Sequence, residues 1–179
     1  MAGELTLYGS PGSGSAAIEM ALRAAGVRYT TVRASRWEPG AGLTALARLN
    51  PLAQIPTLVL ADGTVLTESV AILIHLGLTH PSAGLLPAEP SARATVLRGL
   101  AFIGANAYAA VSVSDYPERW TTARSAPARA RVRQAARAQL HRDWELFADL
   151  FGAWGVLARP MPGALAFLAV VVSQWSGAR

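Results

Sequence analysis

The sequence predicts an α/β domain followed by an all-helical domain. Strand and helix patterns alternate over the first eighty residues, three prolines then interrupt a short segment, and only helical periodicity follows it. We therefore divide the chain of 179 residues into a first domain over 1–80, a linker over 81–90 and a helical domain over 91–179.

The first part of the chain is predicted to form a βαβ unit. Leu5–Tyr8 has the composition of a short strand, a glycine- and serine-rich loop follows, and 16–25 is rich in helix formers and ends at Gly26. Tyr29–Val32 is a second run of strand-forming residues. A strand, a helix and a second strand in this order usually form a right-handed unit in which the two strands are parallel.

A hairpin and a further helix are expected to complete this domain. Two apolar runs, 57–60 and 64–66, flank Asp62-Gly63, a pair that favours tight hairpin turns. A helix over 68–78 follows, and we expect Thr67 to be its N-cap residue.

The second domain is predicted to be helical throughout. Ser91 is placed to cap a long helix, and a second long helix begins near Pro127 with one apolar stripe. That stripe comprises Val132, Ala136, Leu140, Trp144, Phe147 and Phe151. A third helix over 164–175 is apolar all round and so should be buried, yet no later segment remains to cover it.

The composition excludes several kinds of chemistry. With 52% hydrophobic and 15% charged residues the chain can form a packed core, and the absence of cysteine excludes disulfides, thiolate metal sites and a cysteine nucleophile. The amino terminus lacks a secretion-signal pattern, and the longest apolar stretch is only about half the length that crosses a bilayer. We expect a soluble, cytoplasmic protein with no membrane partner.

The net charge of +5 comes entirely from the second half of the chain. Six arginines lie between Trp120 and Asp143 with no acid among them: Arg124, Arg129, Arg131, Arg133, Arg137 and Arg142. The sequence has sixteen arginines and no lysine, a pattern that we attribute to genomic codon bias in preference to selection for phosphate binding. We interpret the run as a solvated helix face and do not expect a nucleic-acid partner.

Three short segments of the first domain carry possible chemistry. Gly12–Ser15 opens a helix, where amides and hydroxyls stabilise an anion or thiolate, although an ordinary capped turn has the same composition. If the bond between Ile55 and Pro56 is cis, the backbone of Ile55 faces outward and can pair with an extended peptide. Thr67-Glu68-Ser69 places an acid and a hydroxyl at a helix start, which also fits simple capping.

Together these segments resemble the glutathione S-transferase superfamily. The stretch LYGSPGS at 7–13 is similar to its first strand and catalytic loop, NPLAQIPTL at 50–58 to its Asn-Pro and Val/Ile-Pro signature, and DGTVLTESVAI at 62–72 to its glutathione-binding segment. The resemblance implies a thioredoxin-like first domain followed by an all-α domain.

The resemblance also implies a site for glutathione. In relatives the residue before the cis-proline pairs with the cysteinyl part, and an acid and a hydroxyl take the γ-glutamyl group. The residues carried over are Gln54, Ile55, Pro56, Glu68 and Ser69. Aligned with the family, Ser13 matches the thiol-activating serine, Ser15 and backbone amides alone are the alternatives, and Gly14 stands where beta-class enzymes have a cysteine.

On this resemblance we expect a bacterial detoxification enzyme, a homodimeric transferase that joins glutathione to a small hydrophobic electrophile. Asn106 and Tyr108 are the expected electrophile-pocket residues. The three histidines have no metal-ligand spacing, so we expect no metal.

The second domain departs from the family pattern. Gly163-Ala164-Leu165-Ala166 replaces the family's capping box, and the helical domain looks truncated. The competing hypotheses are therefore a non-catalytic binding or assembly module with this fold and, more weakly, an arginine-mediated binder of acidic partners.

Overall fold

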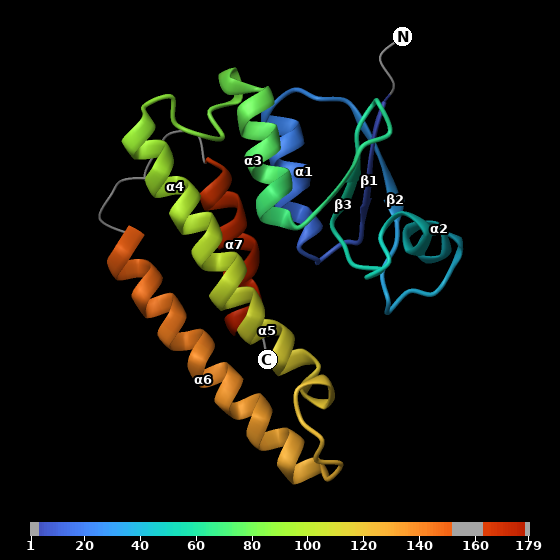
Figure 1. The fold of residues 1–179 in the computed structure, drawn as a ribbon, viewed down its shortest axis with the longest axis vertical. Helices are drawn as coiled ribbons and strands as arrows, with labels where there is room; N and C mark the ends of the chain where they lie inside the picture. Colours follow the sequence, from blue (N-terminus) through green and yellow to red (C-terminus); the bar gives the residue numbers. More distant parts are fainter. Residues whose placement is uncertain (1–3, 152–162, 178–179) are drawn as a thin grey trace.

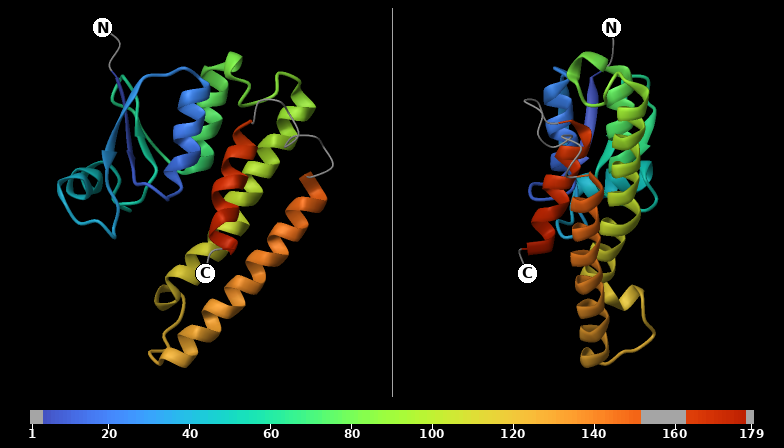
Figure 2. Two further views of the ribbon diagram at one scale, coloured as in Figure 1. Left: turned by 180° about the vertical axis from the view of Figure 1, so that it is seen from behind. Right: turned by 90° about the vertical axis from the view of Figure 1, so that its left-hand side faces the viewer.

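The computed structural model describes residues 4–151 and 163–177 of the chain. It confirms the predicted order, with a four-stranded sheet and its helices first and a helical region after them (Figure 1). The elongated helices of the second part lie beside the α1 and α3 face of the first part (Figure 2).

The sheet is built as predicted from a βαβ unit and a hairpin. Strands β1 (Leu5–Gly9) and β2 (Tyr29–Arg33) are parallel and joined through helix α1 (Ser15–Ala24). Strands β3 (Thr57–Val59) and β4 (Val65–Thr67) are antiparallel, and the sheet order is β2-β1-β3-β4. The turn between β3 and β4 contains Asp62-Gly63, and Gly63 has a φ of 88°.

One face of the sheet carries the core of this domain. Helices α1 and α3 (Ser69–Thr79) pack there, so that Leu7 and Leu58 meet Ile18 and Ile72 in one buried cluster. Helix α2 (Ala41–Leu49) lies on the other side of the sheet (Figure 1). The sequence analysis did not anticipate α2, although Leu43, Leu46 and Leu49 follow helical spacing.

The expected N-cap of α3 is wrong by one residue. Thr67 is the last residue of β4, where it pairs with Thr57, and Glu68 is the N-cap residue. Glu68 has a φ of 63°, in the left-handed region that few non-glycine residues adopt, and its side chain makes no capping bond. The chain thus turns sharply between sheet and helix.

Among the residues that the structure describes, the second domain contains one long, uninterrupted helical run and two further α-helices. The run consists of α4 (Pro90–Phe102), a π turn η2 (Ile103–Ala107) and α5 (Tyr108–Asp115), and α6 (Ala126–Phe151) lies alongside it. By length and composition alone this run could cross a bilayer, but it packs here between α6 and α7 (Ala164–Gly177).

The expectation that Ser91 caps helix α4 is wrong. The N-cap residue is Glu89, whose carboxylate accepts hydrogen bonds from the amides of Ser91, at 2.9 Å, and Ala92, at 2.6 Å. A carboxylate at this end of a helix also faces the positive end of the helix dipole.

Helix α7 is covered by segments that precede it in the chain. It packs against α1, α3 and α4, and Leu165, Leu168 and Val172 are almost completely buried (Figure 1). The expectation that no segment could cover this helix is therefore wrong, because cover comes from both domains and not from a later segment. At its start the amide of Ala164 donates to the carbonyl of Leu85 at 2.9 Å, which replaces one bond of the missing capping box.

The arginines of α6 are only partly a solvated face. Arg131 and Arg142 are exposed, but Arg133 donates from Nε to the carbonyl of Ser114 at 3.0 Å and so ties α6 to α5. The apolar stripe faces inward, and the rings of Phe147 and Phe151 contact the ring of Phe102 in tilted and edge-to-face arrangements.

Candidate functional site

A cavity of about 500 Å³ lies between the loops of the first domain and the α4–α5 run. Its volume is typical of sites for small molecules. Seven of the nine site residues expected from the sequence line it: Ser13, Gln54, Ile55, Pro56, Glu68, Ser69 and Tyr108. Ser15 and Asn106 are not among the lining residues.

A chain of buried hydroxyl groups lies at the start of α1. Ser13 Oγ and Ser15 Oγ are 2.9 Å apart, and the amide of Ser15 donates to Ser13 Oγ at 3.2 Å. Ser15 Oγ also accepts from the amide of Ser10 and lies 3.3 Å from the carbonyl of Ser10. Of the two candidate serines, only Ser13 faces the cavity.

This chain of hydroxyl groups has two proton arrangements, because each serine has one hydrogen to donate. If Ser15 donates to the carbonyl of Ser10, Ser13 donates inward to Ser15. If Ser15 donates to Ser13, the hydrogen of Ser13 is free to point into the cavity. The second arrangement is the one that a negatively charged ligand atom in the cavity would favour.

The loop before β3 presents its backbone to the same cavity. The bond between Ile55 and Pro56 is cis, the condition under which the sequence analysis expected Ile55 to face outward. Ile55 lines the cavity, and neither its N–H nor its C=O has a hydrogen-bond partner within the described residues. The buried side chain of Asn50 fixes this loop by donating to the carbonyl of Gln54 and to Thr57 Oγ1, each at 3.1 Å.

Glu68 and Ser69 lie at the junction of β4 and α3. Ser69 is buried at the first turn of the helix, whereas Glu68 is exposed at the cavity wall. Over the part of the chain that the structure describes, no hydrogen bond or ion pair reaches the carboxylate of Glu68. This carboxylate is available to a cationic group of a ligand.

The two residues expected in the electrophile pocket point in different directions. Tyr108 lines the cavity with its hydroxyl oxygen buried against Gly14, while Asn106 is exposed and donates from Nδ2 to the carbonyl of Phe102 at 3.0 Å. Val70 on α3 and Ala101 and Val111 on the α4–α5 run form an apolar part of the cavity wall, which Ser112, Asp115 and Arg119 also line.

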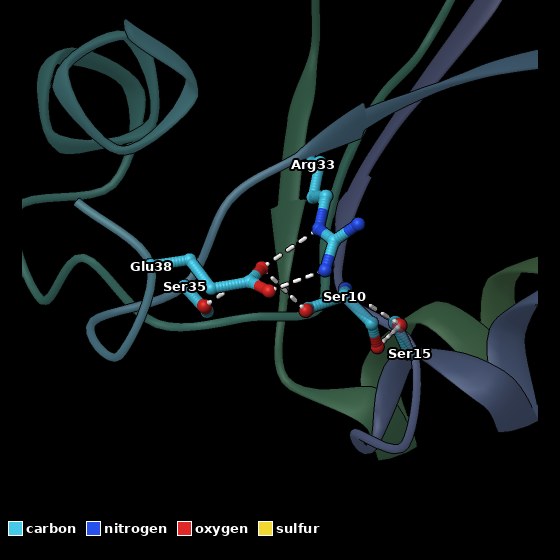
Figure 3. Close-up of polar contacts among 5 residues, drawn as sticks. All are labelled: Ser10, Ser15, Arg33, Ser35 and Glu38. Carbon is cyan, nitrogen blue, oxygen red and sulfur yellow. Dashed lines mark hydrogen bonds and ion pairs between the residues drawn. The ribbon is translucent and has the colours of Figure 1, made fainter. Parts of the chain in front are cut away.

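An ion-pair cluster that the sequence analysis missed supports the loop after β1. Glu38 accepts from Arg33 Nε at 2.9 Å, from Ser10 Oγ at 3.0 Å and from Ser35 Oγ at 3.4 Å, and it also contacts Arg33 Nη2 (Figure 3). The Arg33 guanidinium, followed by the Ser10 hydroxyl, lowers the pKa of Glu38 to about 2. Because Ser10 also contacts Ser15, the cluster joins the β2 loop to the start of α1 (Figure 3).

Two cationic side chains at the cavity were also missed. Arg36 lines the cavity and donates to the backbone carbonyls of Leu52 and Ala53, and Arg119 lies over the ring of Tyr116 with its Cζ 4.0 Å from the ring centroid. Arg119 lies in the stretch YPERW at 116–120, which resembles bacterial members of the same superfamily, whereas no sequence signal marks Arg36. With Glu68 the cavity thus offers groups of both charges. Within residues 4–151 and 163–177, no cluster of three or more potential metal-ligating side chains occurs.

A thioredoxin-like domain, a helical domain and a cavity between them form the architecture of the glutathione transferases. The family model of the glutathione S-transferase N-terminal domain matches residues 15–78. Residues 15–78 thus form a glutathione S-transferase N-terminal domain, and the fold of the described residues is that of the glutathione S-transferase superfamily.

Individual proteins are similar to this chain over different lengths. It is 36% identical over 117 residues to the GST-like protein YncG of Escherichia coli (strain K12), covering 65% of this chain and 57% of that protein. It is 42% identical over 77 residues to a probable maleylacetoacetate isomerase of Caenorhabditis elegans, covering 43% of this chain and 34% of that protein. The match therefore spans less than two thirds of either curated relative.

The solved structures match over nearly the whole chain. A glutathione transferase homologue from Sulfitobacter, crystallised with bound glutathione, has a TM-score of 0.82 and 25% identity, and the alignment covers 100% of this chain and 86% of that one. The bacterial transferase BphK, solved as a ternary complex, has a TM-score of 0.77 and 26% identity, with 96% of this chain and 82% of that one covered.

Proposed function

We propose that this protein binds glutathione in the cavity between its domains and activates the thiol for attack on a small hydrophobic electrophile. The observation that carries the proposal is the position of three unpaired or reorientable groups on one cavity wall: the Ile55 backbone, the Glu68 carboxylate and the Ser13 hydroxyl.

The charges of the cavity fit the tripeptide. Glutathione has an ammonium group, two carboxylates and a thiol. Glu68 suits the ammonium group, the start of α3 at Ser69 suits the γ-glutamyl carboxylate, and the free backbone of Ile55 suits the cysteinyl peptide group. The bound peptide would run along the loop before β3.

Activation of the thiol requires stabilisation of its negative charge. A free thiol has a pKa of about 8.5, so only a few per cent is thiolate at neutral pH. Ser13 lies at the start of α1, where its hydroxyl and the helix dipole act on the same atom. The neighbouring amide of Ser15, which donates to Ser13 Oγ, holds that oxygen in place.

The second substrate would lie against the apolar side chains of the helical domain. Ala101 and Val111 of the helical domain, with Val70 of α3 beside them, form that part of the cavity, which supports a hydrophobic electrophile and not a nucleic acid. The thiolate would attack the electrophilic carbon, and the leaving group would depart with the bonding electrons.

Isothermal titration calorimetry with glutathione, together with an aryl-halide conjugation assay, tests this proposal. We expect binding by the unaltered chain and binding about tenfold weaker or more in Glu68→Gln, the loss that removing a charge-assisted hydrogen bond produces. Glu118→Gln, outside the cavity, is the matched control. Binding without turnover would favour the non-catalytic module, and the absence of binding would overturn the proposal.

A further inference from the structure

The start of α3 and the α4–α5 run meet at a buried hydroxyl group. A Cβ atom added at Gly104 would lie 3.1 Å from Val70 Cγ2, so the two elements are in close contact one turn before Tyr108. Tyr108 Oη is removed from solvent and has no hydrogen-bond partner among the residues that the structure describes. A buried polar group without a partner costs free energy, so its presence calls for an explanation.

The position of this hydroxyl group depends on a glycine of the first domain. A Cβ atom added at Gly14 would lie 2.7 Å from Tyr108 Oη and 3.8 Å from Pro56 Cδ. The hydroxyl group therefore takes up the space that any other residue at position 14 would fill. The oxygen exposes less than 1 Å², so a ligand in the cavity must act on it through another side chain.

Ser69 is the side chain that can connect this hydroxyl group to the cavity. It is the first residue of α3, is buried, and lines the cavity beside Glu68. Burial raises the pKa of Tyr108, and the hydroxyl of the neighbouring Ser69 partly offsets this effect, so the phenol keeps its hydrogen at neutral pH. The two hydroxyl groups are neighbours but do not form a hydrogen bond in the structure.

We propose that Tyr108 is a positioning residue that holds Ser69 for the γ-glutamyl carboxylate of glutathione. When Ser69 donates its only hydrogen to the carboxylate, its oxygen keeps lone pairs that can accept the hydrogen of the phenol. A chain of two hydrogen bonds then runs from the helical domain through the start of α3 to the ligand, and the negative charge of the carboxylate strengthens it. The inference rests on the proposed function and adds that the helical domain takes part in binding the peptide.

The free and the bound protein then differ in one buried hydrogen bond. In the free protein the phenol has no partner, and its burial costs free energy. Binding of the carboxylate orients Ser69 so that the phenol gains a partner, and this gain contributes to the affinity for glutathione. Removing the hydroxyl group should therefore weaken binding without destabilising the free protein.

Calorimetry with two ligands tests this role. The first ligand is glutathione, and the second is 4-aminobutanoyl-cysteinylglycine, which lacks only the γ-glutamyl carboxylate. In Tyr108→Phe we expect glutathione to bind about fivefold more weakly, the effect of losing one hydrogen bond, and the analogue to bind as it does to the unaltered chain. Tyr116→Phe, at the same cavity but beneath Arg119, is the matched control and should change neither affinity.

A double-mutant cycle tests the contact without the analogue. Ser69→Ala should weaken the binding of glutathione, and the addition of Tyr108→Phe should cause no further loss, because the phenol then has nothing to hold. The melting temperature of Tyr108→Phe without ligand should not fall. Where the analogue binds too weakly to measure, the cycle decides.

Three results would overturn this inference alone. They are an unchanged affinity for glutathione in Tyr108→Phe, an equal loss of affinity for both ligands, and additive losses in the double variant. An equal loss for both ligands is the result that a merely structural tyrosine would give. Failure of the unaltered chain to bind glutathione would overturn the proposed function and this inference with it.

Discussion

The side chain of Leu165 in α7 packs directly onto Gly99 in α4. A Cβ atom at residue 99 would lie 2.7 Å from Leu165 Cδ2 and 2.9 Å from Cδ1, and Leu165 is itself completely buried. The two helices approach this closely because residue 99 has no side chain. This contact is part of the cover that α4 provides for α7.

Gly99→Ala is expected to destabilise the protein. At an unhindered helix position this change stabilises by about 1 kcal/mol, but here the added methyl overpacks a buried contact, and we expect the free energy of unfolding to fall by about 1 to 2 kcal/mol. Chemical denaturation measures the difference. Leu165→Val, which shortens the opposing side chain, should recover part of the loss in the double variant. An increase in stability in Gly99→Ala would contradict the close packing of α4 and α7.

Ser13→Ala and Ser15→Ala should have different effects. Ser13 faces the cavity, so its removal should lower the thiolate fraction of bound glutathione. Ser15 is buried outside the cavity lining and bonds to the Ser10 backbone, so its removal should lower stability by about 1 kcal/mol and change the thiolate fraction little. Ultraviolet titration measures the thiolate fraction and thermal melting measures the stability. The reverse pattern would assign activation of the thiol to Ser15.

The Glu38 cluster predicts a loss of stability in acid. The pKa of Glu38 is lowered from 4.5 to about 2 in the folded protein, so the unfolded chain binds more protons in this range. The stabilisation is complete above about pH 4.5 and disappears as the pH falls toward 2. Melting temperatures of Glu38→Gln should therefore approach those of the unaltered protein as the pH falls through this range.

The matched control for the acid effect is Glu19→Gln. Glu19 forms an ion pair with Arg23 at 3.8 Å and lacks the additional hydroxyl donors of the Glu38 cluster. We expect its melting temperature to follow that of the unaltered protein more closely between pH 6 and pH 2, a range chosen to include the titration of carboxylates. Equal pH profiles for the two variants would argue against the cluster.

We propose that the protein forms a homodimer. Three large apolar side chains of the first domain are exposed: Trp37, Leu52 and Leu78. Light scattering at micromolar concentration should give twice the chain mass of 18.8 kDa. Leu78→Asp on α3 should shift the protein toward monomer, whereas Leu146→Asp on α6 should not. A monomer at this concentration would count against the proposal.

Local sequence signals were sufficient to predict most of the secondary structure of the first domain. The Asp62-Gly63 turn, the apolar runs around it and the glycine that ends α1 each act within a few residues, and the sheet follows from them. The cap of α3 was misplaced because Glu68 adopts a left-handed conformation that its residue type does not favour. No short-range rule predicts this conformation.

The site was predicted in part for a related reason. The motif residues Ser13, Ile55 and Glu68 could be found because each lies in a recognisable segment. The contact between Gly14 and Tyr108 joins two domains, and a glycine in a loop gives no sign of what fills the space beside it. The cover of α7 was missed in the same way, because it depends on α1 and α3 from the other domain.

The π turn at 103–107 has a consequence for comparing this protein with its relatives. Such a turn holds one residue more than the equivalent length of α-helix, and each residue of a helix advances the side-chain direction by about 100°. Tyr108 follows this turn directly, so the extra residue determines that Tyr108, and not a neighbour in the chain, faces Gly14. In a relative that lacks the insertion, the aligned residue would point elsewhere, and the residue that meets the glycine should be sought one position away.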